Sequence, residues 1–502
     1  MRRFLQRCKV FKRKNEIEND ESKTWSTSHF FDWDLERKYY LQTWAWLVLL
    51  YVVGIVLWGS LFNWRRTPLN YHDWEGINLP RFEAIRDAIN YRMLPLHVNC
   101  TECLHYKTDR FLVLPDVITT PQMLLMSMID VDTFAMVDLL FNYTLATLGL
   151  IYLRQKFKIS LISYSYVFFL FNFNGYIQAH YTVGHATWGG YFLFPWYFVL
   201  LFQLFDQGPS WRWVSNMALL AFYTILAGSQ HHFTWMMLFL VTLAFVYRRG
   251  AKWIVASVIF SGFLSAVRLL PPLIALDSFT SGAFRFLSGY PTSYDFFAAL
   301  VIMHPIDYVV DYISIKVDYW EYDYFVGVVG VVFIGYFGLL NLLRDQKMPR
   351  GFYYLLLPAM VVFLLSQGHI YEYTLYRLPL FSSERVTSRM VSIPVTLLII
   401  TGAVYFQKFL DENPTSVTRW LAGGGLIVLV SEIGMHILTW RIDRIAPFLE
   451  PKEMQFPGNS IVNHPDPQYI FVLSVGSALT LISALILFTL TLREKWKNRL
   501  LT

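Results

Sequence analysis

Long uncharged runs recur along the whole chain, and they limit its possible folds more than any other feature. The first of them, TWAWLVLLYVVGIVLWGSLF (43–62), is long enough to cross a bilayer as a helix, which takes roughly 20 apolar residues. Within lipid, only helices and closed barrels satisfy the backbone, and these runs are continuous rather than alternating. Charged residues make up 16% of the chain, against about 25% in soluble domains. The sequence therefore predicts an all-α, polytopic integral membrane protein.

The apolar runs predict about twelve membrane-spanning helices. They lie near 43–63, 133–153, 160–178, 187–205, 213–229, 232–247, 252–274, 324–343, 352–367, 390–408, 420–439 and 469–492. The expected organisation is a basic cytoplasmic tail (1–42), the first span (43–63), a large first extracytoplasmic loop with short helices (64–132), spans two to seven (133–274), a second such loop (275–323), spans eight to twelve (324–492, with an extracytoplasmic loop at 440–468) and a cytoplasmic tail (493–502).

Basic residues set the expected orientation. RQKFK (154–158), RRGAK (248–252) and RDQKMPR (344–350) fall on the same side as the two basic ends of the chain, and these five concordant segments outweigh the exception, Arg65 and Arg66, on the other side. Cytoplasmic loops carry the excess of Lys and Arg, so both termini are expected in the cytoplasm, in a plasma (inner) membrane. The net charge of +6 follows from this bias and requires no nucleic-acid partner. No cleavable signal precedes the first span, which we interpret as a signal anchor.

Polar and titratable residues gather on the predicted extracytoplasmic side, where spans end. YHDWE (71–75) follows the first span and contains Asp73 and Glu75. The others on that side are His180, His185 and Trp188 between spans three and four, His231 and His232 between spans five and six, Arg268 near the outer end of span seven, and Arg385 and Arg389 before span ten. We expect these side chains to line one cavity at the outer leaflet.

Such a cavity suits a lipid-linked phosphosugar. Arginines would hold the phosphate by charge-assisted hydrogen bonds, and aromatic rings would stack on the sugar. A carboxylate would take the proton of an acceptor hydroxyl as it attacks the anomeric carbon. A one-step inverting transfer needs only one such base, because a phosphate leaving group needs little protonation.

The chain resembles the GT-C glycosyltransferases, and within them the YfhO-like bacterial membrane proteins. The resemblance is carried by HDW (72–74), LPRFEAIRDAINYRMLPLH (79–97), HYTVGHATWGGYFLFPWYF (180–198), WEYDYFVGVVG (320–330) and SSERVTSRM (382–390), which occur in the expected order. It implies transfer of a sugar from a polyprenyl-phosphate donor to an extracytoplasmic glycan, lipid or protein, with a loop Asp as base. Because the chain is short for this family, with no sizeable soluble C-terminal domain expected, a simpler member or a divergent function stays open.

The resemblance and the residue types together assign roles. Asp73 is the expected general base; the expected substrate-binding residues are Glu75, His180, His185, Trp188, His231, Arg268, Arg385 and Arg389. Other readings stay open. Asp73 could cap a helix, and Arg385 and Arg389, which share a helix face, could anchor to lipid headgroups. Glu432 and His436 also share a face, within span eleven, and predict a buried polar surface.

The sequence offers no convincing metal-ligand set, so no cofactor is predicted and a dependence on a divalent cation stays open. The histidines near His180 and His231 could bind a metal, but hydrogen bonds to sugar or phosphate are the preferred reading. Cys100 and Cys103 form a lone CxxC beside His97 and could make a disulfide, stay free, or bind a metal.

Two rival functions have about the same number of spans. A transporter or flippase of a lipid-linked saccharide would place its substrate near the midplane on interrupted helices, with matching halves, and neither pattern is visible. A non-catalytic assembly subunit with a GT-C-like fold would carry the same binding residues, so the sequence does not separate it from an enzyme.

Overall fold

The computed structural model of the chain describes residues 30–36, 38–99, 108–275, 286–303, 318–344, 350–378, 381–449, 451 and 460–500. Cys8, Cys100 and Cys103 lie outside these residues, so the predictions for the cysteines stay predictions. Within the described residues the regular elements are helices, joined in places by isolated β-bridges. The predicted all-α class is confirmed.

The longer helices are α3 (Tyr40–Leu61), α4 (Leu79–Tyr91), α5 (Val131–Phe157), α6 (Leu161–Asn172), α7 (Gly175–Thr182), α8 (Phe194–Gln207), α9 (Trp211–Leu226), α10 (Gln230–Val246), α11 (Ala251–Leu264), α17 (Arg350–Leu365), α19 (Ser392–Glu412), α20 (Ser416–Thr439) and α22 (Pro467–Leu500). The shorter ones are α2 (Trp33–Glu36), α12 (Ala266–Leu269), α14 (Ser293–Ala299), α15 (Gly327–Val332), α16 (Asn341–Arg344), α18 (Gly368–Tyr373) and α21 (Ile442–Ile445).

Seven helices of the described chain are long and apolar enough to cross a membrane. They are Tyr40–Leu61, Val131–Phe157, Ala186–Gln207, Gly327–Arg344, Thr387–Glu412, Ser416–Thr439 and Pro467–Arg499. An eighth span results if Arg248–Leu264 and Ala266–Ile274, which are bent by 61° relative to each other, count as one. The protein is therefore a multi-span membrane protein, but the predicted number of about twelve spans is not confirmed.

The difference comes from helices that are shorter than their apolar sequence suggested. The predicted span at 160–178 breaks after α6, because the side chain of Asn174 accepts a hydrogen bond from the Ile177 N–H and starts α7 anew. The helices α9, α10 and α17 have 16, 17 and 16 residues. At 1.5 Å per residue, each covers only about 25 Å of a hydrocarbon core that is about 30 Å thick.

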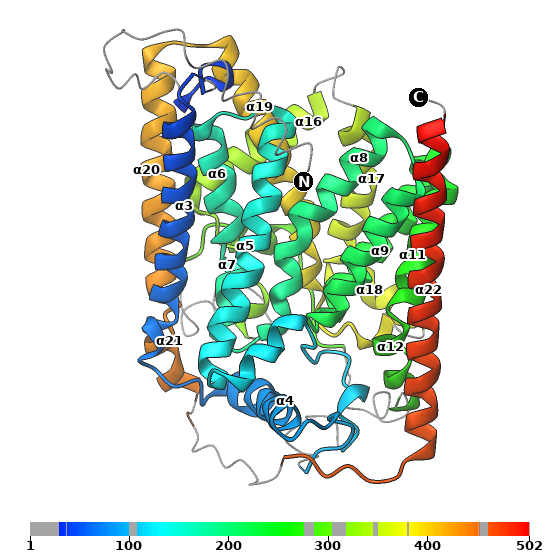
Figure 1. Cartoon of the computed structure of the whole chain (residues 1–502). Coiled ribbons are helices and arrows are strands. Elements are labelled where there is room, and N and C mark those ends of the chain that lie inside the picture. Colours follow the sequence, from blue (N-terminus) through cyan, green and yellow to red (C-terminus); the bar gives the residue numbers. More distant parts are fainter. Residues whose placement is uncertain are drawn as a thin grey trace.

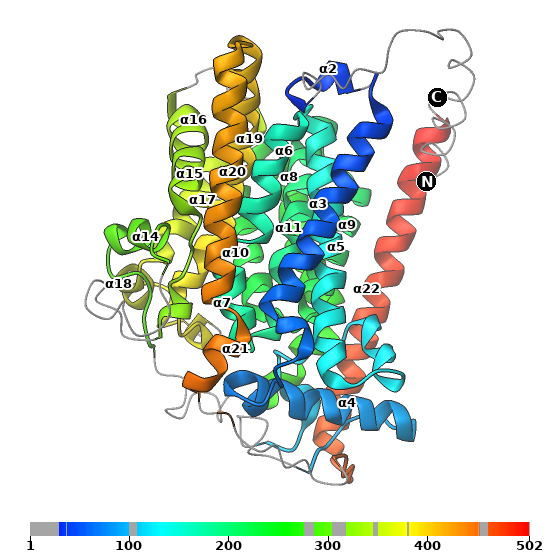
Figure 2. The ribbon, with the colours of Figure 1, turned by 90° about the vertical axis from the view of Figure 1, so that its left-hand side faces the viewer.

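The helices stand side by side as a bundle (Figures 1 and 2). α6 is buried on all its faces, and 89% of the most apolar 18-residue stretch of the span Thr387–Glu412 is buried, so both lie inside the bundle. α3 and α20 pack together at one edge, and α22 packs on α9, α11 and α12 at the other. α2 and the C-terminal end of α22 lie at the top of Figure 1, whereas α4 and α21 lie at the bottom. The first loop thus covers one end of the bundle.

Candidate functional site

Asp73 lies in the first loop, beyond the end of α3 at Leu61, where the chain folds back onto the end of α7 and the residues that follow it. The Asp73 N–H donates to the Val183 carbonyl (3.3 Å), and the Trp74 indole N–H donates to the Tyr181 carbonyl (3.1 Å). Gly184 has a φ of +98°, and a Cβ at this position would overlap the backbone of Trp74. Only glycine therefore allows the two segments to approach this closely.

Two histidines stand behind the Asp73 carboxylate. Asp73 Oδ2 lies 3.0 Å from His185 Nε2, and His185 Nδ1 lies 2.6 Å from His180 Nδ1. His180 is fully buried, and its Nε2 has no hydrogen-bond partner among the described residues. If His180 Nδ1 carries the proton between the two rings, the neutral His185 accepts it at Nδ1 and donates its own Nε2–H to Asp73. This bond orients the carboxylate, whose side chain is 30% exposed.

An ion pair between Arg389 and Glu321 lies beside Trp188. Arg389 donates from Nε and from an Nη to the two carboxylate oxygens of Glu321, and its Cζ lies 4.8 Å from the centroid of the Trp188 ring. Burial alone would raise the pKa of the Glu321 carboxyl, but the Arg389 guanidinium outweighs it and holds that pKa below its ordinary value. Glu321 is therefore an anion at neutral pH, and Arg389 is already neutralised.

A histidine–glutamate contact joins two segments that are far apart in the sequence. His231, at the start of α10, places its Nδ1 2.7 Å from Glu384 Oε1. The neighbouring Arg385 side chain is half-buried and lines the same cavity as His231. The Arg385 carbonyl accepts hydrogen bonds from the N–H groups of Leu287 (2.9 Å) and Ser288 (3.2 Å). These two bonds fix the backbone of the segment that contains Arg385.

One cavity of about 1230 Å³ connects these groups. Its polar part is lined by His72, Asp73, Asn78, Arg81, Asp116, His185, Thr187, Trp188, Gln230, His231, Thr234, Asp318, Glu321, Ser382, Arg385 and Arg389. Its apolar part is lined by side chains of α10, α11, the α12 region and α22, among them Met237, Val241, Ile259, Phe263, Leu270 and Leu479. Val241, Ile259 and Phe263 are 43–49% exposed, so the apolar part continues to the outer surface of the bundle.

Six of the nine residues predicted for the site line this cavity: Asp73, His185, Trp188, His231, Arg385 and Arg389. His180 contacts it only through His185 and Trp188. Glu75 belongs to the π-helical turn Trp74–Asn78 but is not part of the lining. The carboxylates of Asp116, Glu321 and Glu384 were not predicted individually. Each of them pairs with a residue far away in the sequence, and the sequence alone does not show these pairings.

Arg268 has a different place from the one predicted. Its guanidinium donates to the backbone carbonyls of Leu114 (2.7 Å), Leu112 (3.3 Å) and Val117 (3.3 Å). The side chain is buried and is absent from the cavity lining. We therefore reassign Arg268 from phosphate binding to fastening the first loop onto α12, since its donors are directed at the loop backbone.

Glu432 and His436, which share a face of α20, contact different partners and not each other. Glu432 Oε1 accepts from the Val328 N–H (3.1 Å) at the start of α15. His436 Nε2 lies 3.0 Å from Asp323 Oδ2, and the Trp440 indole N–H donates to the same oxygen (2.8 Å). Asp323 and His436 are fully buried, so this network joins α20 to the segment before α15 and is closed to a substrate.

Comparison of the chain with protein-family models, with curated proteins and with solved structures found no match.

Proposed function

We propose that this protein is a membrane glycosyltransferase of the GT-C type. It moves a sugar from a polyprenyl-phosphate donor to the hydroxyl of an extracytoplasmic glycan, lipid or protein, with inversion at the anomeric carbon. The membrane is a plasma (inner) membrane, both termini are cytoplasmic, and the cavity opens on the opposite side.

The observation that carries the proposal is the two-part lining of the cavity. One part holds carboxylates, imidazoles and arginines, and the other is apolar and continues to the lipid-facing surface. A polyprenyl-phosphate sugar has the same division, because its isoprenoid chain is apolar and its phosphate and sugar are polar. The volume of about 1230 Å³ is above the range of about 300–1000 Å³ typical of small-molecule pockets, as a lipid-linked ligand requires.

The polar groups fit two tasks of the reaction, which are removal of the acceptor proton and stabilisation of the leaving phosphate. Asp73 takes the proton of the acceptor hydroxyl while the oxygen attacks the anomeric carbon, and His185 orients that carboxylate. The bond between the anomeric carbon and the phosphate oxygen breaks, and its electron pair leaves with the phosphate. Arg385 stabilises the charge that develops on that phosphate, and Arg389, whose own charge Glu321 offsets, contributes as a hydrogen-bond donor. Trp188 is only 4% exposed, and its ring packs against Arg389, so it positions that arginine in the cavity rather than offering a free face to the sugar.

The proposal is tested with the full chain in lipid nanodiscs and a panel of radiolabelled polyprenyl-phosphate sugars. A photoreactive group in the isoprene units nearest the phosphate reports where the donor binds. We expect cleavage of the sugar–phosphate bond with release of polyprenyl phosphate, and crosslinks to α10 and α11 near Val241 and Phe263.

Three results would count against this assignment. Movement of the donor across a liposome bilayer without bond cleavage would replace the transferase by a flippase. Crosslinks confined to the outer faces of α20 or α22 would remove the cavity as the donor site. Neither binding nor turnover of any donor, with candidate acceptors added, would favour the assembly subunit.

A further inference from the structure

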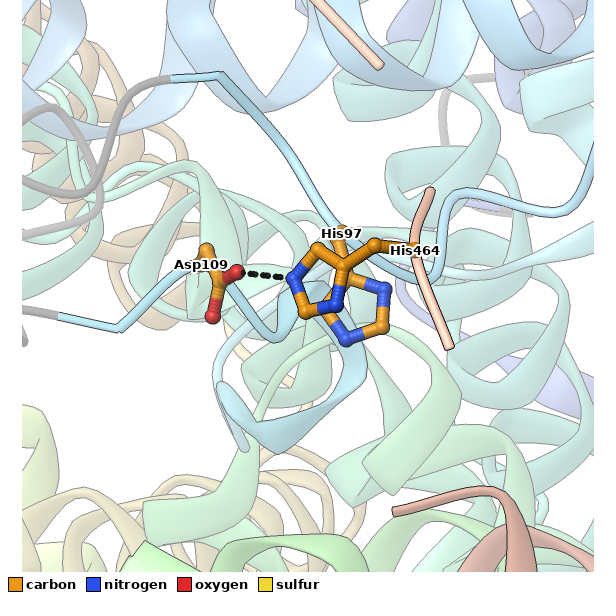
Figure 3. Close-up of side chains that lie close together, drawn as sticks. All are labelled: His97, Asp109 and His464. Atoms are coloured by element: carbon orange, nitrogen blue, oxygen red, sulfur yellow. Dashed lines mark hydrogen bonds and ion pairs between the residues drawn. The ribbon is translucent and has the colours of Figure 1, made fainter. Parts of the chain in front are cut away.

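A second polar cluster lies where the first loop meets the segment before α22. It contains His97, Asp109 and His464 (Figure 3), none of which lines the cavity described above. One potential ligand atom of each residue lies within 4.8 Å of those of the other two. The His97 and His464 rings are stacked, with centroids 3.8 Å apart, and His464 Nε2 lies 2.7 Å from Asp109 Oδ2.

His97 is the member of the cluster whose hydrogen bonds are incomplete. The side chain is fully buried, yet its Nδ1 has no partner among the described residues. Its Nε2 has one distant partner, Asp466 Oδ2 at 3.4 Å. A buried polar atom is normally satisfied, so an imidazole with one long bond and one unsatisfied nitrogen indicates a ligand.

The surroundings of the cluster favour a cation. Asp109 and Asp466 carry two negative charges, and Arg110 offsets one of them by donating to both oxygens of Asp466 (2.6 and 3.2 Å). With neutral imidazoles the group therefore has a net charge of −1. Asp466 also accepts from the Tyr469 N–H (3.2 Å), so it is fixed beside His97. A carboxylate that holds the second nitrogen of a ligand histidine is a recurring arrangement around metal ions.

We propose that His97, Asp109 and His464 bind a divalent cation of the Zn²⁺ class. Two imidazole nitrogens and one carboxylate oxygen are a donor set that Zn²⁺ takes, whereas Mg²⁺ and Ca²⁺ prefer oxygen ligands. Zinc would enter between His464 and Asp109, whose ligand atoms would move from 2.7 Å to roughly 3.3 Å apart. Any proton that these two atoms share leaves to solvent as the metal binds. Water completes the coordination.

The site would fasten two distant parts of the chain to each other. The Val462 N–H already donates to the His97 carbonyl (3.1 Å), and Asn463 Oδ1 accepts from the N–H groups of Leu96 (3.1 Å) and His97 (2.9 Å). A metal would add coordination bonds to these hydrogen bonds. The first loop, which carries cavity residues such as Asp116, would then be held at both the α12 and the α22 side.

The test is Zn²⁺ binding by the purified full chain in detergent or nanodiscs, after removal of metals with a chelator. Metal content is measured by mass spectrometry, affinity by a competing zinc dye, and stability by thermal unfolding with and without Zn²⁺. The variant is His464→Ala, because this side chain is 48% exposed and its loss should leave the fold intact. Asp109→Asn is the second variant. The matched control is His369→Ala, an exposed histidine on α18.

We expect the wild type and His369→Ala to retain about one Zn²⁺ per chain and to unfold at a higher temperature with Zn²⁺ than without. His464→Ala and Asp109→Asn should raise the Kd for Zn²⁺ more than about tenfold and lose this thermal shift. Equal Zn²⁺ affinity in the wild type and His464→Ala would overturn the proposal. So would a thiolate-to-metal absorption band in the Co²⁺-loaded protein, since it would assign the metal to cysteines.

Discussion

Replacing Glu321 with Gln removes one partner of a bidentate ion pair that is almost buried. The Glu321 and Arg389 side chains are 9% and 13% exposed. Breaking a buried pair costs about 3–5 kcal/mol, because the remaining charge stays in a poorly solvated place. Both side chains keep a little exposure, so we expect a loss of about 3 kcal/mol in the free energy of unfolding. The double variant Glu321→Gln/Arg389→Gln, which carries neither charge, should recover part of this loss.

The assay is denaturant and thermal unfolding of the purified variants in one detergent, with Glu75→Gln as the control carboxylate outside the cavity. The pH dependence gives a second signature. Arg389 holds the pKa of Glu321 below its ordinary value, so the stabilisation is present above the unfolded pKa and is lost as pH falls through the lowered one. This loss should be missing from Glu321→Gln. If Glu321→Gln unfolds like Glu75→Gln at neutral pH, the pair does not hold the site together.

Two further substitutions separate the arginines by role. Arg385→Gln should weaken binding of a polyprenyl-phosphate sugar roughly 10- to 100-fold, as expected for the loss of one charge-assisted hydrogen bond. The control is Arg377→Gln, at an exposed arginine. Equal affinity of these two variants for the donor would contradict the prediction. Arg268→Met should leave donor affinity nearly intact but lower the free energy of unfolding by about 3 kcal/mol, because three loop carbonyls lose a charged donor. Faster proteolysis of the first loop would accompany it, and a variant as stable as wild type would refute the fastening role.

The sequence was enough to predict the helical membrane class and where the helices lie, because apolar runs report directly on burial in lipid. It was not enough to predict their lengths. Asn174 interrupts the apolar run 160–178 and caps a new helix, α7, within it. A bend between Leu264 and Ala266 divides the apolar run 252–274. Such breaks depend on caps and on tertiary packing rather than on hydropathy.

The residues of the cavity could be predicted as a group but not as pairs. Asp73, His231 and Arg385 all lie next to the ends of apolar runs, on the side predicted to be extracytoplasmic. Their positions relative to these runs were therefore enough to predict that they lie in the same region. Their partners were not, since the His231–Glu384 contact joins residues 153 positions apart. Arg268 shows the same limit, because a charge at the end of a span can serve the backbone of a loop as well as a ligand.

The most direct measurement is donor cleavage by Asp73→Asn in nanodiscs, in a single turnover with saturating polyprenyl-phosphate sugar and acceptor. The change keeps the shape of the side chain but removes its capacity to take a proton. General-base catalysis typically contributes 10²–10⁴-fold. We predict that Asp73→Asn binds the donor and unfolds like the wild type but cleaves it at least about 100-fold more slowly, whereas Glu75→Gln keeps the wild-type rate. Cleavage by Asp73→Asn at the wild-type rate would contradict the assignment of Asp73 as the base.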